Sequence, residues 1–132
     1  MAAGLATQAA ARIGCPVIVR SASILGLDDY PADPNAVAVC TEIDIDLSGH
    51  RSQPLTDELI AWCDYILVME YRHARQIGEA FPQIGERVLL LGSFAEAGEI
   101  SDPLGGWKFR FRRTRDELSI AADSFINRLP KR

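Results

Sequence analysis

The residues best able to do chemistry in this sequence are a few thiols, imidazoles and carboxylates. There are three cysteines, Cys15, Cys40 and Cys63, and a thiolate is an effective nucleophile or metal ligand. They form no CxxC pair, and their odd number argues against a disulfide framework. No pair or trio of histidine, cysteine and acidic residues has the spacing of a metal site. We therefore interpret the thiols as reduced, packed side chains and expect neither metal nor cofactor.

Acid–base or anion chemistry could also come from His50, Arg51 and Asp102. Histidine can act as a base near neutral pH, and arginine binds phosphate. A carboxylic acid can protonate a leaving group. However, Asp102 directly precedes Pro103, a combination that is common in turns. His73 lies between polar neighbours on an expected helix, where we expect an exposed side chain.

Length and charge limit the classes of function. The chain has 132 residues, of which 48% are hydrophobic, and this suits one domain with a real core. The formal net charge is −4, which favours neither nucleic-acid nor membrane binding. The sequence shows no secretory leader and no apolar run of membrane-spanning length, so a cytoplasmic location is expected.

Strands and helices are predicted to alternate along the chain, which indicates an α/β domain with a parallel sheet. A threonine at position 56 has the type and place of a helix cap, and two apolar runs are typical of buried strands. Helices are predicted over Met1–Ile13, Asn35–Glu42, Asp57–Trp62, Arg72–Ala80 and Trp107–Arg128, and strands over Val17–Val19, Tyr65–Met69 and Val88–Leu91. The pattern opens on a helix, although the first element of such folds is commonly a central strand.

Several short motifs occur together and in a consistent order. They are Asp46–Ser52 followed by Leu55-Thr56, the run Asp64–Met69, the loop Asp102–Gly106, the stretch Thr114–Leu118 and the weaker match Val19–Ser23. In these motifs the chain resembles the low-molecular-weight protein tyrosine phosphatase family. The resemblance covers nearly the whole sequence. It implies a single domain over residues 1–132, an α/β three-layer sandwich with a short parallel sheet.

The resemblance also points to a part of the family pattern that these residues do not contain. In that family the first strand leads into a C-x5-R-[ST] loop, and a helix similar to Met1–Leu5 follows. Cys15 precedes Arg20 by a spacing one residue too short, and the other two cysteines have no arginine at the required distance. The nucleophile, the phosphate-binding arginine and the first strand would therefore all precede Met1.

By resemblance, Asp102 matches the family's general acid, which would be vestigial without a nucleophile. The His50-Arg51 segment is mainly structural in that family. The first helix could still direct backbone amides at an anion, so we predict a weak anion site at Met1, Ala2 and Ala3. A free amino group at this positive helix end is unfavourable without a counter-anion.

Two functions follow from this interpretation. The first is a catalytically inactive, phosphatase-like module that binds a partner or regulates a true phosphatase. The alternative is an active protein tyrosine phosphatase, a phosphomonoester hydrolase, whose strand and loop are omitted by a misplaced start. An arsenate reductase is disfavoured because no cysteine follows Cys63. Leu104 stands where many eukaryotic members have tyrosine, which indicates the bacterial branch.

A missing inner strand would leave two neighbouring strands with unpaired backbone groups, which is costly. Three arrangements could correct this. The remaining strands could close up, another chain could exchange a strand, or an upstream segment could fill the place. We expect self-association, as a homodimer or by strand exchange, because the remaining strands look unmodified for a new edge.

Overall fold

The computed structural model describes residues 1–130, which form a mixed α/β fold. The α-helices are α1 (Ala2–Ile13), α2 (Pro34–Thr41), α3 (Asp57–Trp62), α4 (Tyr71–Ala80) and α5 (Lys108–Arg128). Two 3₁₀ helices, η1 (Pro82–Arg87) and η2 (Leu91–Ala95), accompany the strands β1 (Ile66–Val68) and β2 (Val88–Leu90). The strands pair in parallel, with Leu67 opposite Leu89. The expected α/β class with a short parallel sheet is confirmed.

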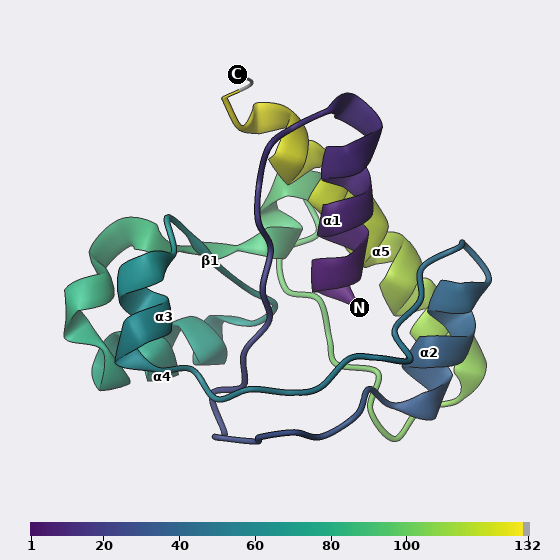
Figure 1. The fold of residues 1–132 in the computed structure, drawn as a ribbon, viewed down its shortest axis with the longest axis horizontal. Helices are drawn as coiled ribbons and strands as arrows, with labels where there is room; N and C mark the ends of the chain where they lie inside the picture. The colour runs from purple at the N-terminus through teal and green to yellow at the C-terminus, as the bar shows by residue number, and fades with distance from the viewer. Residues whose placement is uncertain (131–132) are drawn as a thin grey trace.

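The helices form two groups on either side of these strands. In Figure 1, α1, α2 and α5 lie on one side, whereas α3 and α4 lie on the other. Each group surrounds its own cluster of buried apolar side chains, and the larger cluster includes side chains of α1 and α5. Among the described residues, no helix combines the length and the apolar character needed to span a bilayer.

Local signals explain where several helices begin and end. The Thr56 side chain accepts a hydrogen bond of 3.2 Å from the Leu59 amide, so the predicted cap of α3 is confirmed. Asp33 caps α2 in the same way, accepting from the Asn35 amide at 2.8 Å. At the other end of α1, Gly14 adopts the left-handed conformation (φ 67°) that glycine allows without a Cβ clash.

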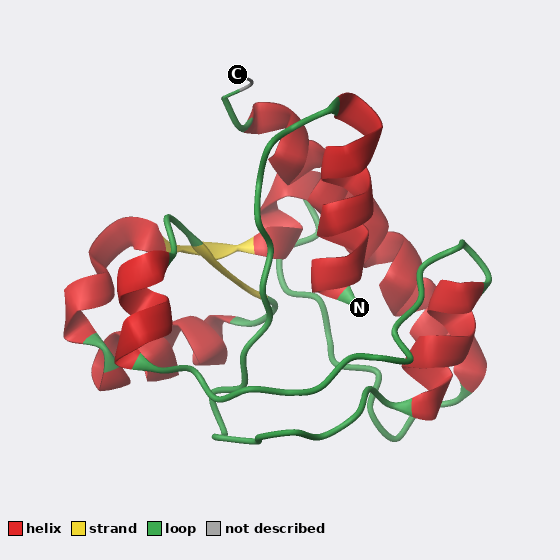
Figure 2. Cartoon of the chain, viewed as in Figure 1, coloured by secondary structure: helices red, strands yellow, loops and turns green. Residues whose placement is uncertain are grey.

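The predicted strand at Val17–Val19 is wrong. Residues 15–22 run alongside the fold as an extended segment that has no strand partner within residues 1–130, and Figure 2 draws it as loop. β-branched residues favour strands only where a neighbouring strand supplies hydrogen bonds and packing. Ile18 is 77% exposed, whereas Val17 and Val19 on the other face of the segment pack against the larger cluster. Residues 17–19 have therefore not closed up to pair with β1, which pairs with β2 alone within residues 1–130.

Three contacts hold this extended segment in place. The guanidinium of Arg20 lies over the ring of Trp62, 4.9 Å from its centroid. The Gln53 side chain donates to the Ser21 carbonyl at 2.9 Å, and the Ser23 amide donates to the Gln53 carbonyl at 2.7 Å. The segment is thus anchored to α3 and to residues 53–54, rather than to a strand.

An ionic cluster joins α2 to α5. The Glu42 carboxylate accepts three hydrogen bonds from Arg112, at 3.0, 3.1 and 2.7 Å, and a fourth from Arg115 at 2.8 Å. The hydrogen bond from Arg112 is the largest cause that lowers the pKa of Glu42 from 4.5 to about 2. Paired geometry of this kind is stronger than an ordinary surface ion pair.

The first prediction concerns the face of α5 that is buried. Ile126 is 1% exposed, whereas Ile120 on the same helix is 63% exposed. We expect Ile126→Ala to lower the free energy of unfolding by about 2–5 kcal/mol, because it leaves a cavity in the core. Ile120→Ala should change it by less than about 0.5 kcal/mol. Urea unfolding followed by circular dichroism measures both, and equal effects would contradict the described packing.

The second prediction concerns Glu42 and pH. A carboxyl whose pKa falls on folding stabilises the protein above its unfolded pKa, and this contribution is lost as pH falls through the folded value. The contribution of Glu42 should therefore be complete above about pH 4.5 and decline towards pH 2. Glu42→Gln should lower the melting temperature near neutral pH and make little difference close to pH 2. A Glu79→Gln control on α4 should show no such convergence.

Candidate active site

The amino end of α1 has backbone donors without protein partners. The first amide bonded within the helix is that of Leu5, which donates to the Met1 carbonyl at 3.0 Å. Within residues 1–130, no group accepts a hydrogen bond from the amides of Ala2, Ala3 or Gly4, and Met1 provides no side-chain cap. Such amides and the helix dipole favour an anion.

These donors open into a pocket of about 330 Å³. Its wall is built from residues far apart in the sequence: Met1, Ala2, Ala3 and Gly4 at α1, Asp33 at the start of α2, His50, and the loop residues Asp102 and Leu104. The structure thus brings together all four residues that the sequence predicted for the site, Met1, Ala2, Ala3 and Asp102. Their proposed roles stay predictions.

The loop that carries Asp102 has a defined shape. The Leu104 amide donates to Asp102 Oδ1 at 2.9 Å, which is the turn expected for aspartate before proline. The Gly106 amide closes the next turn on the Pro103 carbonyl at 2.8 Å. The Ile100 amide donates to the Met69 carbonyl, just after β1, at 2.9 Å. Asp102 is exposed, in the loop that follows this contact with the end of β1.

Gly106 is required by close packing in this loop. A Cβ on Gly106 would lie 2.8 Å from the Pro103 carbonyl oxygen and 2.9 Å from Cδ of Arg110. Both distances are too short for a real side chain. Gly105 has a left-handed conformation, with φ of 81°, which glycine adopts readily. The two glycines therefore allow the tight turn that holds Asp102 at the pocket.

Burial and like charge shift the basic groups of the pocket. Burial lowers the pKa of the Met1 amino group, partly opposed by Cys40. Burial is also the main cause that lowers the pKa of His50, followed by the positive charges of Met1 and Arg51. Neutral imidazole is therefore favoured at His50. An anion in the pocket would oppose both shifts, because it stabilises the charged forms.

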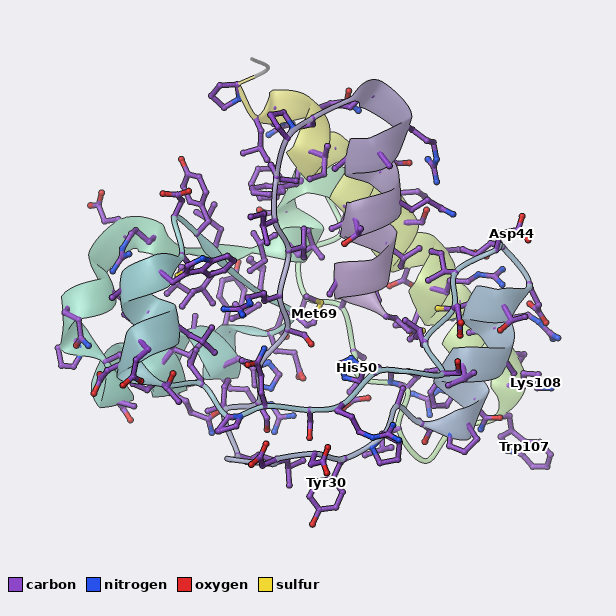
Figure 3. All side chains as sticks on the ribbon, in the orientation of Figure 1. Tyr30, Asp44, His50, Met69, Trp107 and Lys108 are labelled. Carbon is purple, nitrogen blue, oxygen red and sulfur yellow. The ribbon has the colours of Figure 1, made fainter. Side chains whose placement is uncertain are left out.

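His50 is a pocket residue that sequence reasoning set aside as structural. In Figure 3 it lies beneath the amino end of α1, in the middle of the molecule. Arg51, by contrast, turns away: it donates to the His50 carbonyl at 2.9 Å and lies 3.9 Å from Asp29. Proximity to Met1 arises from long-range packing, so no local signal could have separated these two neighbours.

The cysteines have the packing roles predicted for them. Cys15 and Cys40 are buried in the larger core cluster, and Cys63 packs against the smaller one. Burial raises the pKa of the Cys40 thiol, which disfavours its thiolate form. Within residues 1–130, no three histidine, cysteine or acidic residues gather as metal ligands would.

A ligand site at the carboxyl end of a parallel sheet, facing a helix amino end, is typical of α/β proteins that bind phosphate groups. The sequence profile of one such family, described as low molecular weight phosphotyrosine protein phosphatase, matches residues 1–132. The chain belongs to this family, and the resemblance drawn from its motifs is confirmed.

Curated relatives match most of the chain. A protein-arginine-phosphatase of Bacillus subtilis (strain 168) is 34% identical over 133 residues, covering 99% of this chain and 88% of the relative. The low molecular weight protein-tyrosine-phosphatase Etp of Escherichia coli (strain K12) is 32% identical over 115 residues, covering 87% of this chain and 78% of the relative.

Solved structures share the fold. A YwlE arginine phosphatase, a cysteine-to-serine mutant with a phosphorylated active-site serine, has a TM-score of 0.92 and 33% identity, covering 97% of this chain and 85% of that one. Vibrio vulnificus Wzb in complex with benzylphosphonate has a TM-score of 0.89 and 27% identity, covering 97% of this chain and 88% of that one.

The third prediction tests the anion site. Phosphate should shift the NMR signals of the Ala3 and Gly4 amides, with weaker binding as pH rises and the Met1 amino group loses its proton. Asp102→Asn should tighten phosphate binding, because it removes a negative charge from the pocket wall. Asp123→Asn is the matched control, since Asp123 pairs with Arg12 at the far end of α1. Equal effects of the two variants would contradict the site.

Proposed function

We propose that this chain acts as a protein phosphatase, with Asp102 as the acid that protonates the leaving group. The observation that carries the proposal is that Asp102 and the unpartnered amides of α1 line the same pocket. Amides at a helix amino end suit the phosphoryl oxygens, and a nearby carboxylic acid suits the leaving atom. The names of the relatives support this function over the inactive module.

The nucleophile is the remaining requirement. Of the described thiols, Cys40 is 0% exposed with a raised pKa, and Cys15 is 7% exposed. Neither can attack a phosphoryl group in the pocket without unfolding part of the core. Cys63 is held on the smaller cluster, where its thiol lies 3.6 Å from the Ile60 carbonyl. We propose that the attacking thiolate belongs to a loop joined to Met1.

Two segments of the described chain have edges with which such a strand could pair. The extended residues 15–22 and the free edge of β1 both have backbone groups without strand partners within residues 1–130. A strand between them that leads into α1 would form a right-handed β–α–β unit with the extended segment. Its carboxyl end would then reach the pocket at Met1, where a thiolate is favoured by the helix dipole.

In the proposed reaction the thiolate attacks phosphorus, and the bond from phosphorus to the leaving atom breaks. Asp102 gives its proton to that leaving atom, so that the released side chain is neutral. Water then attacks the phosphorus of the phosphoenzyme while Asp102 accepts a proton from that water. The phosphorus–sulfur bond breaks, which restores the thiolate and releases phosphate. Phosphotyrosine is the proposed substrate. Phosphoarginine is the second candidate, because the Bacillus subtilis relative that matches 99% of the chain is named for it.

The fourth prediction compares three proteins with phenyl phosphate and p-nitrophenyl phosphate as substrates. The 132-residue chain should show negligible turnover, and the chain extended by its upstream in-frame codons should be active. Asp102→Asn in the extended protein should lower kcat for phenyl phosphate by about 10²–10⁴-fold. The loss should be smaller for p-nitrophenyl phosphate, whose leaving group needs less help from an acid.

Asp123→Asn is again the control and should retain full activity. If the extended protein shows no turnover, the proposed phosphatase function is wrong and the inactive, phosphatase-like module is favoured. Turnover by the 132-residue chain that survives replacement of Cys15, Cys40 and Cys63 would contradict the thiolate mechanism itself.

A further inference from the structure

The start of α5 and the loop before it present apolar side chains to solvent. Leu104 is 70% exposed, Trp107 is 78% exposed and Phe109 is 64% exposed. Figure 3 shows Trp107 and Lys108 at the outer edge of the molecule, pointing away from it. Tryptophan and phenylalanine are costly to leave in water and are enriched where proteins meet partners. We call residues 104–110 the α5 platform.

The charges of the platform differ from those of the rest of the helix. Further along α5, Arg112, Arg113 and Arg115 all pair with carboxylates of the chain itself. By contrast, Lys108 and Arg110 have no carboxylate within salt-bridge distance among residues 1–130. Two uncompensated cations therefore lie among exposed apolar side chains, on a protein whose net charge is −4.

The platform is continuous with the pocket. Leu104 lines the pocket together with Asp102. Cδ of Arg110 lies over Gly106, within 2.9 Å of where a Cβ would be, so its side chain rests on the same loop. A polypeptide that places one side chain in the pocket could therefore continue over Leu104 onto Trp107 and Lys108, which follow Leu104 closely in the chain.

We propose that the α5 platform binds an acidic segment of the substrate protein, next to its phosphorylated side chain. Carboxylates of that segment would pair with Lys108 and Arg110, and an apolar side chain would cover Trp107. This proposal rests on the phosphatase function, since it names the kind of sequence that surrounds the phosphate. The charge of the platform is complementary to an acidic segment. The net negative charge of the whole protein repels such a segment, so the attraction comes from the local cations Lys108 and Arg110.

The test uses the 132-residue chain and an unphosphorylated peptide of aspartate and glutamate with one central leucine. The chain has two tryptophans, so NMR resolves two indole N–H signals, and Trp62 under Arg20 is an internal reference. Titration should shift the Trp107 signal and leave Trp62 unchanged. Added salt should weaken binding, because exposed charges are screened.

Lys108→Glu should weaken the binding of the peptide by about three- to tenfold, because one exposed attraction becomes a repulsion. The matched control is Arg75→Glu on α4, which makes the same change in net charge away from α5 and should have no effect. A lysine-rich peptide that binds equally well, or equal effects of the two variants, would overturn the proposal. So would a Trp107 signal that depends on protein concentration alone, which would indicate a second copy on the platform.

Because the peptide carries no phosphate, binding is measured separately from catalysis. A failed phosphatase assay with intact peptide binding would overturn the proposed function and leave the acidic docking surface. An active phosphatase without this binding would overturn the docking surface alone.

Discussion

The packing of α1 against α5 is the interaction on which the site depends. Leu5 and Ala9 of α1 and Ala121 and Phe125 of α5 lie in the same buried cluster. Ala121 is completely buried, and small side chains at such a contact allow the two helix backbones to approach closely. The loop with Asp102 leads into α5, so the contact that fixes the amino end of α1 also fixes the acid opposite it.

The sequence predicted most of what local chemistry determines. Gly14 and Thr56 mark helix ends by their own conformations and hydrogen bonds, and the motif around Asp102 drew attention to a residue that lines the pocket. Val17–Val19 was mistaken for a strand because a β-branched run encodes a preference, whereas a strand also needs a partner. The need for glycine at position 92, in η2, could not be predicted from local sequence either. A Cβ there would lie 1.9 Å from the Gly98 carbonyl oxygen, and this contact depends on the folded path of the following loop.

The electrostatics of the pocket follow from burying cations beside a helix amino end. Burial lowers the pKa of both the Met1 amino group and the His50 imidazole. The positive charges of Met1 and Arg51 lower the pKa of His50 further, whereas Cys40 partly opposes the shift at Met1. The acidic side chains of Asp33 and Asp102 line the same pocket. The pocket of the 132-residue chain therefore combines helix amides and basic groups, which suit an anion, with two acidic side chains.

The extended segment, residues 15–22, connects the completion of the sheet with the proposed catalytic site. Its ends are anchored, by Cys15 in the core and by Ser23 on residues 53–54, and Arg20 stacks on Trp62 between them. The segment and β1 do not pair with each other, so each has an edge without a partner strand within residues 1–130. Unpaired edges of this kind promote pairing with other chains. A strand that enters between them would satisfy both edges and would deliver its following loop to the amino end of α1, so the same peptide groups that complete the sheet would also complete the catalytic site.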